Sequence, residues 1–209
     1  MKQIPTILLL GFALSLCNLG NKLKTSSNSG GTGSEKSSSS SSGTAEKGTP
    51  TDAQTQALAG GAEAKWGRQG MSWTVPPKWK EDSNDANQFV WSSPGGSEAA
   101  HLIVSISPMD DSFPTESSIQ AFYDQADTRR KHFEVDELKW VEISGLKGVQ
   151  FRESNPEKPD DFRRLQWLAY RKYAGQVQMI NIMLSSNGSG FPKHQDEMYG
   201  VLYSTKVEH

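Results

Sequence analysis

The chain has 209 residues, and its 22 Lys and Arg against 24 Asp and Glu give a formal net charge of −2. This near balance argues against a general nucleic-acid-binding protein, which needs a basic surface to displace counterions. A single cysteine excludes an intramolecular disulfide and any multi-cysteine zinc or iron–sulfur site.

Residues 1–16 have the pattern of an export signal. Lys2 supplies a positive charge near the N-terminus, and an apolar run follows over residues 7–14. A membrane-spanning helix needs roughly 20 apolar residues, so this shorter run predicts a signal peptide rather than a transmembrane segment.

The string Leu14-Ser15-Leu16-Cys17 resembles the bacterial lipobox, although Leu16 stands where that pattern has Gly, Ala or Ser. The resemblance implies that the Cys17 thiol carries diacylglycerol and becomes the N-terminus after cleavage. We therefore expect an exported protein that a lipid holds at a membrane of the bacterial cell envelope. The alternative is an ordinary secreted protein cleaved after Ser15, which leaves Cys17 as a free thiol in an oxidising compartment.

Residues 17–65 are predicted to be a disordered tether. Residues 21–64 contain ten Ser and seven Gly, and Leu23 and Leu58 are the only large apolar residues there. Such a composition cannot offset the entropy cost of ordering the chain. As a random coil, residues 18–65 span about 35–40 Å.

The predicted globular domain covers residues 66–209. All aromatic residues except Phe12 lie at or after Trp66, and a core needs such large side chains. Alternating or apolar runs predict strands over residues 71–75, 87–91, 100–106, 137–143, 148–152, 165–170 and 177–184. The last two strands are expected to form a hairpin through Ala174-Gly175.

Two helices complete the predicted domain. Ser117 and Gln120 have capping-box spacing at the start of a helix that ends near Lys131. Pro192 suits the first turn of a closing helix. Runs of strands separated by single helices favour an α+β fold, in which helices pack on an antiparallel sheet.

The stretch from Gly70 to Trp79, GMSWTVPPKW, resembles the opening of PsbP-like domains, where a strand ends in proline followed shortly by tryptophan. Lys78 departs from the pattern, which often has Gly at this position. The resemblance covers about residues 68–207 and implies an α/β/α sandwich used mostly as a binding or assembly module, commonly exported and sometimes lipidated in bacteria. Pro76 and Trp79 match the family as structural residues, and no functional residue carries over.

No catalytic, cofactor-binding or metal-binding residue is predicted. Ser189 lies in a loop string rather than in a nucleophile elbow. The histidines are expected to be structural or exposed, since none has the spacing of a metal site. They are His101, His132, His194 and His209.

Three charged clusters are expected to be solvated. Asp110-Asp111 and Asp160-Asp161 lack the ligand spacing of a calcium loop. The mixed charges of residues 158–164 are predicted to form surface ion pairs, with recognition of a partner as the alternative.

The tryptophan positions do not decide whether the domain has a surface on which a ligand could stack. Those within strand patterns, Trp73, Trp91 and Trp167, are expected in the core. Trp66 and Trp79 could instead be partly exposed and stack on a ligand, or could fix the entering chain to the core.

Two functions remain after this reading of the sequence. The first is a non-enzymatic binding or assembly module, held at the membrane through Cys17, whose partner is an envelope protein or a small ligand. The second is a small extracytoplasmic enzyme, which needs a concave pocket that joins a histidine such as His101 to a loop carboxylate.

Overall fold

The structure, a computed structural model, describes residues 43–208. The predicted signal peptide, the lipidation site Cys17, the first part of the predicted tether and His209 lie outside these residues. No helix among the residues described is long and apolar enough to cross a membrane.

The larger of two sheets has eight strands in the order β1-β7-β8-β9-β10-β6-β5-β4. Their bounds are β1 Glu46–Lys47, β4 Lys80–Asn84, β5 Gln88–Ser92, β6 His101–Met109, β7 Val135–Ile143, β8 Leu146–Glu153, β9 Phe162–Tyr173 and β10 Gln176–Asn187. All neighbours are antiparallel except β1 and β7, which run parallel. The sheet is therefore mixed, since β1 adds one parallel pair at the edge of the antiparallel sheet predicted for residues 66–209.

A second, three-stranded sheet has the order β11-β3-β2, with β2 Ala62–Trp66, β3 Met71–Val75 and β11 Lys206–Val207. The helices are α1 Asp52–Ala57, α2 Thr115–Lys131 and α3 Phe191–Tyr203, with short 3₁₀ turns at Gly67–Gln69 and Gly96–Glu98.

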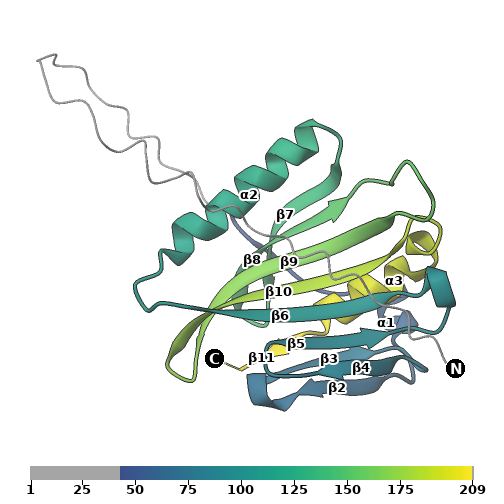
Figure 1. Cartoon of the computed structure of the whole chain (residues 1–209), viewed down its shortest axis with the longest axis horizontal. Coiled ribbons are helices and arrows are strands. Elements are labelled where there is room, and N and C mark those ends of the chain that lie inside the picture. The colour runs from purple at the N-terminus through teal and green to yellow at the C-terminus, as the bar shows by residue number, and fades with distance from the viewer. Residues whose placement is uncertain (1–42, 209) are drawn as a thin grey trace, which may run out of the picture. The chain divides into compact units, whose positions relative to one another are not determined.

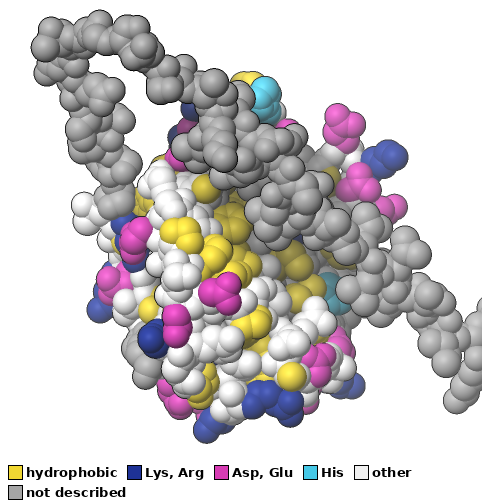
Figure 2. Space-filling view, turned by 60° about the vertical axis from the view of Figure 1, so that its left-hand side comes forward, with side chains coloured by type: hydrophobic (Ala, Val, Ile, Leu, Met, Phe, Trp, Pro, Cys, Tyr) yellow, Lys and Arg dark blue, Asp and Glu magenta, His cyan; other side chains and the backbone are white. Residues whose placement is uncertain are grey.

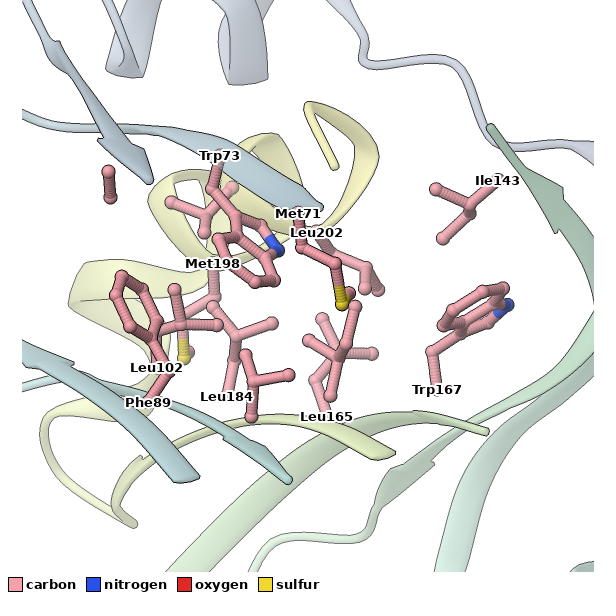
Figure 3. Close-up of a cluster of buried hydrophobic side chains, with 14 of the residues drawn as sticks. Met71, Trp73, Phe89, Leu102, Ile143, Leu165, Trp167, Leu184, Met198 and Leu202 are labelled. Carbon is pink, nitrogen blue, oxygen red and sulfur yellow. The ribbon is translucent and has the colours of Figure 1, made fainter. Parts of the chain in front are cut away.

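Helices cover both faces of the large sheet (Figure 1). On the outer face, α2 packs against β7, β8 and β9 around Trp140 and Leu168. On the inner face, α3 and the small sheet enclose the main core, where the rings of Trp73 and Phe89 stack 5.2 Å apart (Figure 3). These layers confirm the predicted α+β sandwich, with helices packed on a sheet.

Local sequence signals explain several elements. Ala174 and Gly175 have φ of +50° and +82°, the backbone of a tight hairpin turn, and they join β9 to β10 as predicted. Pro192 lies in the first turn of α3. The capping box predicted at Ser117 and Gln120 is wrong, because α2 begins two residues earlier and no side chain caps it.

The domain begins before Trp66, contrary to the predicted boundary. Among residues 43–65, β2 pairs with β3, and Leu58 packs on the main core. Thr51 and Gln54 form a capping box at the start of α1. Tertiary pairing therefore orders a segment whose composition predicts a coil, and the prediction of a disordered tether is wrong for residues 43–65.

Candidate ligand-binding cleft

The inner face of the large sheet changes from apolar to polar along β7. Alternate residues of a strand point to the same face, so Glu137 and Lys139 share the inner face with the core residues Val141 and Ile143. On β8, Arg152 pairs with Glu137 across the ladder and lies on the same face. The strand pair thus carries a core at one end and a charged floor at the other.

A cleft of about 320 Å³ lies over this polar floor. Its walls come from β1 and the residues after it, from β7 and β8, and from α3. The lining residues are Glu46, Lys47, Gly48, Thr49, Thr51, Gln54, Glu137, Lys139, Val141, Arg152, Gln195, Tyr199 and Tyr203. The volume lies in the range of small-molecule sites, and the lining is more polar than is usual for them.

Glu137 is the centre of a hydrogen-bond network at the floor of the cleft. Its Oε2 accepts a 2.8 Å bond from the Tyr199 hydroxyl, and its Oε1 accepts a 2.6 Å bond from Nε2 of the buried Gln150. Lys139 and Arg152 lie 3.5 and 3.7 Å from its two oxygens. Arg152 also donates a 3.3 Å bond to the Tyr199 hydroxyl. These mutual contacts fix the floor in one arrangement.

The network keeps Tyr199 neutral and Lys139 charged. Burial, together with the carboxylate of Glu137, raises the pKa of the Tyr199 hydroxyl well above its usual value, although Arg152 opposes the shift. Burial alone would lower the pKa of Lys139, but Tyr203, Glu137 and Glu46 outweigh it, so this pKa is raised. At neutral pH the floor therefore presents a neutral phenol, an ammonium and a guanidinium.

One wall of the cleft is a short strap, residues 46–49, that lies along the edge of β7. Its residues Glu46 and Lys47 pair with Val141 and Glu142, and the Gly48 N–H donates a 2.8 Å bond to the Glu142 carbonyl. A Cβ on Gly48 would lie 3.0 Å from side-chain atoms of both Ile143 and Tyr203. A larger residue here would require the strap or these side chains to shift by a few tenths of an ångström.

The histidines considered as catalytic lie outside the cleft lining. Burial lowers the pKa of His101, against a smaller opposing effect of Asp82. His194 contacts Glu197 at 2.7 Å within α3, and His132 ends α2. Over residues 43–208 no group of three or more His, Cys, Asp and Glu could hold a metal ion.

The other predicted candidates have structural surroundings. Ser189 donates a 3.3 Å bond to the Asn187 side chain in its own loop. In the cluster of residues 158–164, Arg163 is buried and bonds Asp136 at 2.6 Å. Trp66 and Trp79 are both buried, so neither forms the exposed stacking platform that the sequence left open. Trp91 is only half-buried, whereas Trp73 and Trp167 lie in the core as predicted.

The outer face of the large sheet is the second surface of note. Where α2 does not pack, β5, β6 and β10 present half-buried apolar side chains: Val90, Ile103, Met109, Val177, Met179 and Met183. Figure 2 shows one face of the molecule, on which hydrophobic side chains gather while most charges lie around them.

Solved structures share this fold at low sequence identity. LpqN of Mycobacterium tuberculosis, described as involved in cell envelope biogenesis, matches with a TM-score of 0.52 and 10% identity, over 71% of this chain and 86% of its own. Cyanobacterial PsbP (CyanoP) of Synechocystis sp. PCC 6803 gives a TM-score of 0.44 and 12% identity, over 70% and 92%.

A Bacteroides thetaiotaomicron protein gives a TM-score of 0.44 and 14% identity over 67% of this chain, which spans only 46% of that protein. No family model and no curated protein matches the sequence. The likeness to LpqN concerns the fold alone, and it agrees with the α+β sandwich predicted from the sequence.

The cleft itself was not predicted from the sequence. The sequence does contain one indication of the cleft, in the alternation of β7. Glu137 and Lys139 lie on the same face of the strand as the buried residues Val141 and Ile143. Charged residues on the buried parity of a strand indicate that the core ends there. The remaining walls come from residues predicted to be tether and from α3, which local patterns do not bring together.

Proposed function

We propose that this chain is an extracytoplasmic binding protein, anchored to a bacterial membrane through lipidated Cys17, that holds a small ligand in the cleft over Glu137. The observation that carries the binding role is the mutual pairing of Glu137, Tyr199 and Arg152, which fixes polar groups in one arrangement at the floor of a cavity. The resemblance of the sequence to the lipobox supports the anchor. The fold shared with LpqN of Mycobacterium tuberculosis, described as involved in cell envelope biogenesis, agrees with this location.

The position of the strap supports the same proposal. The chain between Cys17 and residue 43 leads directly into β1, so the anchor and the wall of the cleft are joined by a single stretch of sequence. The segment that follows the lipid anchor would therefore hold the cleft close to the membrane from which a ligand is taken.

The anchor is tested by expressing the full chain in a bacterium beside Cys17→Ala. We expect a diacylglyceryl mass increase and partition into the detergent phase, both lost in Cys17→Ala. A soluble product that begins at Leu16 would instead establish ordinary secretion after Ser15.

The binding role is tested on the purified Cys17→Ala chain, labelled with ¹⁵N, by adding the small-molecule fraction of the host envelope. We expect amide shifts at the strap and at Tyr199 and its neighbours, with the added compounds recovered unchanged. Chemical conversion of an added compound would favour the alternative, a small extracytoplasmic enzyme. An unchanged spectrum would contradict the binding role.

A further inference from the structure

Phe133 is an exposed aromatic residue at a position where helices commonly have glycine. It follows α2 with φ of +62°, and 87% of its surface is exposed. Its N–H donates to the Arg130 carbonyl and the next N–H donates to the Arg129 carbonyl, both at 3.0 Å, which is the Schellman pattern that closes a helix. Glycine adopts this left-handed conformation without strain, whereas a bulky residue does not. The folded domain gains little from this ring, and a contact outside the domain would account for it.

The second exposed aromatic residue, Phe162, lies at the same end of the sheet. It begins β9 and is 56% exposed. Two residues further along β9, Arg164 contacts the Glu153 carboxylate at 3.1 Å, and Arg129 of α2 contacts the same carboxylate at 2.9 Å. In Figure 1, α2 runs into β7 on the side of the molecule where β8 turns into β9. Among residues 43–208, Phe133 and Phe162 are the two large hydrophobic side chains that are exposed.

The end of α2 is the basic side of this surface. Arg130 and Lys131 share the Asp127 carboxylate at 2.6 and 2.8 Å, and their side chains are 48% and 73% exposed. The ion pairs of this region join four cations to three carboxylates, which leaves a net charge of +1. The groups are Arg129, Arg130, Lys131, Arg164, Asp127, Glu134 and Glu153. The loop over residues 154–161 carries three carboxylates and one lysine, so the positive charge gathers beside Phe133 rather than at the start of β9.

The chain enters the domain on the outer side of the large sheet, where α2 packs. A Cβ on Gly43 would lie 3.0 Å from Cδ1 of Trp140, and Ala45 packs against the outer cluster that contains Trp140. The 25 residues between Cys17 and Gly43 would span about 25–30 Å as a random coil. A lipid on Cys17 would therefore hold this side of the domain near the bilayer, at an effective concentration on the order of millimolar.

We infer that the end of α2 is a membrane-docking surface, in which the Phe133 ring enters the bilayer interface while Arg130 and Lys131 contact anionic phospholipid headgroups. The inference goes beyond ligand binding and rests on the proposed anchor, which supplies the local concentration. A protruding ring between long basic side chains suits a bilayer, which accepts it without a preformed pocket. A stable protein interface instead needs about 800 Å² on each partner and a packed apolar centre.

Docking at this end would also orient the cleft. Strand β7 begins two residues after Phe133 and carries Glu137 on its inner face, where Arg152 of β8 pairs with it. The polar floor of the cleft thus lies at the end of the sheet that would face the membrane. The lipid would set the distance between domain and bilayer, and the Phe133 contact would set the orientation.

The test is co-sedimentation of the purified Cys17→Ala chain with vesicles of equal parts phosphatidylglycerol and phosphatidylcholine, at millimolar lipid. We expect saturable binding that Phe133→Gly weakens about tenfold. Glycine relieves the left-handed backbone at this position, so Phe133→Gly should not lower the melting temperature. A loss of binding without a loss of stability distinguishes a membrane contact from a structural role.

Two further variants localise the effect. Ala174 has φ of +50° in the β9–β10 turn, at the opposite end of β9 from Phe162. Ala174→Gly changes the same kind of backbone position outside the surface, and it should bind vesicles within about twofold of the parent. Lys131→Gln removes an exposed cation, so it should weaken binding to the mixed vesicles about threefold and leave binding to pure phosphatidylcholine vesicles unchanged.

Absence of binding by the parent, or equal binding by Phe133→Gly and the parent, would overturn the docking inference. A lipid-free dimer that Phe133→Gly dissociates, in a chain that leaves vesicles unbound, would overturn it in favour of a second copy on this surface. The vesicle assay uses a chain without the lipid, so its failure leaves the proposed anchor standing. Failure of the anchor has a different signature, an unmodified Cys17 in the mass of the full chain.

Discussion

The Tyr199 hydroxyl donates a 2.8 Å hydrogen bond to Oε2 of Glu137, joining the closing helix α3 to strand β7, 62 residues earlier in the chain. Tyr199→Phe removes this bond and leaves a carboxylate oxygen with one fewer donor. We expect a loss of about 1–3 kcal/mol in the free energy of unfolding, measured by urea denaturation. Tyr203→Phe, on the next turn of α3, is the control and should lose less. Equal losses in the two variants would contradict a special role for the Tyr199–Glu137 bond.

The same hydroxyl predicts a pH dependence at the alkaline end. Burial raises the pKa of Tyr199 in the folded protein above the value of about 10 in an unfolded chain, so the folded state keeps a proton that the unfolded state loses. The contribution of Tyr199 to stability is therefore complete below pH about 10 and declines as the pH rises toward the folded pKa. The stability difference between the parent and Tyr199→Phe should shrink between pH 9 and pH 11. A difference that stays constant over this range would show that the hydroxyl ionises as it does in the unfolded chain.

Gly48→Ala tests the close approach of the strap to the core. The new Cβ would lie 3.0 Å from Cγ1 of Ile143 and from Cδ1 of Tyr203, so either the core or the strap must move. Such overpacking costs about 1–3 kcal/mol. We expect faster hydrogen exchange at the Gly48 amide, which bonds the Glu142 carbonyl. Gly67→Ala places a Cβ in open space and should leave both stability and exchange nearly unchanged.

Sequence patterns predict those parts of this molecule that are set locally. Strand β3 follows from its own alternation, and the β9–β10 hairpin follows from a turn that needs positive φ at Ala174 and Gly175. Strand β4, Lys80–Asn84, has no apolar face and is a strand only because β5 pairs with it. Its charged residues protect an edge of the sheet from pairing with other strands. A charged edge strand and a polar loop have the same sequence pattern, so the sequence does not distinguish them.

The cleft depends on contacts between distant parts of the chain, which explains why it was missed. From its composition the strap is predicted to be part of a polar linker. It becomes ordered because two of its residues pair with β7. In the sequence, Glu137 is a single charged residue of a predicted strand. Its role in the cleft depends on the hydrogen bond that Tyr199 of α3 donates to it. In both cases the stabilising contacts are tertiary. The sequence offers only amino-acid composition and the alternation of residues along a strand, and neither predicts such contacts.

Arg163 and Arg164 form a matched pair of adjacent side chains with opposite environments. Arg163 is buried, donates to the Glu153 carbonyl at 2.8 Å and to Asp136 at 2.6 Å, and lies over the Phe191 ring at 4.4 Å. Arg163→Met leaves the Glu153 carbonyl without this donor and leaves Asp136 bonded to Arg152 alone, and it should cost about 2–4 kcal/mol. Arg164 is 40% exposed beside Glu153, so Arg164→Met should cost less than about 1 kcal/mol. Thermal denaturation of both variants checks the ranking, and equal losses would contradict it.

Asp85 holds the turn between β4 and β5. Its Oδ1 accepts bonds from the backbone N–H groups of Asn87 at 2.9 Å and Gln88 at 2.8 Å, and these bonds, led by that from Asn87, lower the pKa of Asp85. Asp85→Ala removes the acceptor and should lower the melting temperature at pH 7, whereas Asp85→Asn keeps an oxygen at this position and should lower it less.

The sign of the Asp85 effect with pH follows from its lowered pKa. The unfolded chain binds the proton at a higher pH than the folded chain, so the stabilisation is complete above the unfolded pKa of about 4 and is lost as the pH falls through the folded pKa. The difference in melting temperature between the parent and Asp85→Ala should therefore narrow between pH 5 and pH 2. Because Asp85→Asn has no charge to lose, its difference from Asp85→Ala should change much less over the same range. A parent-to-Ala difference that is independent of pH would show that the ionised carboxylate is not what the two amides bind.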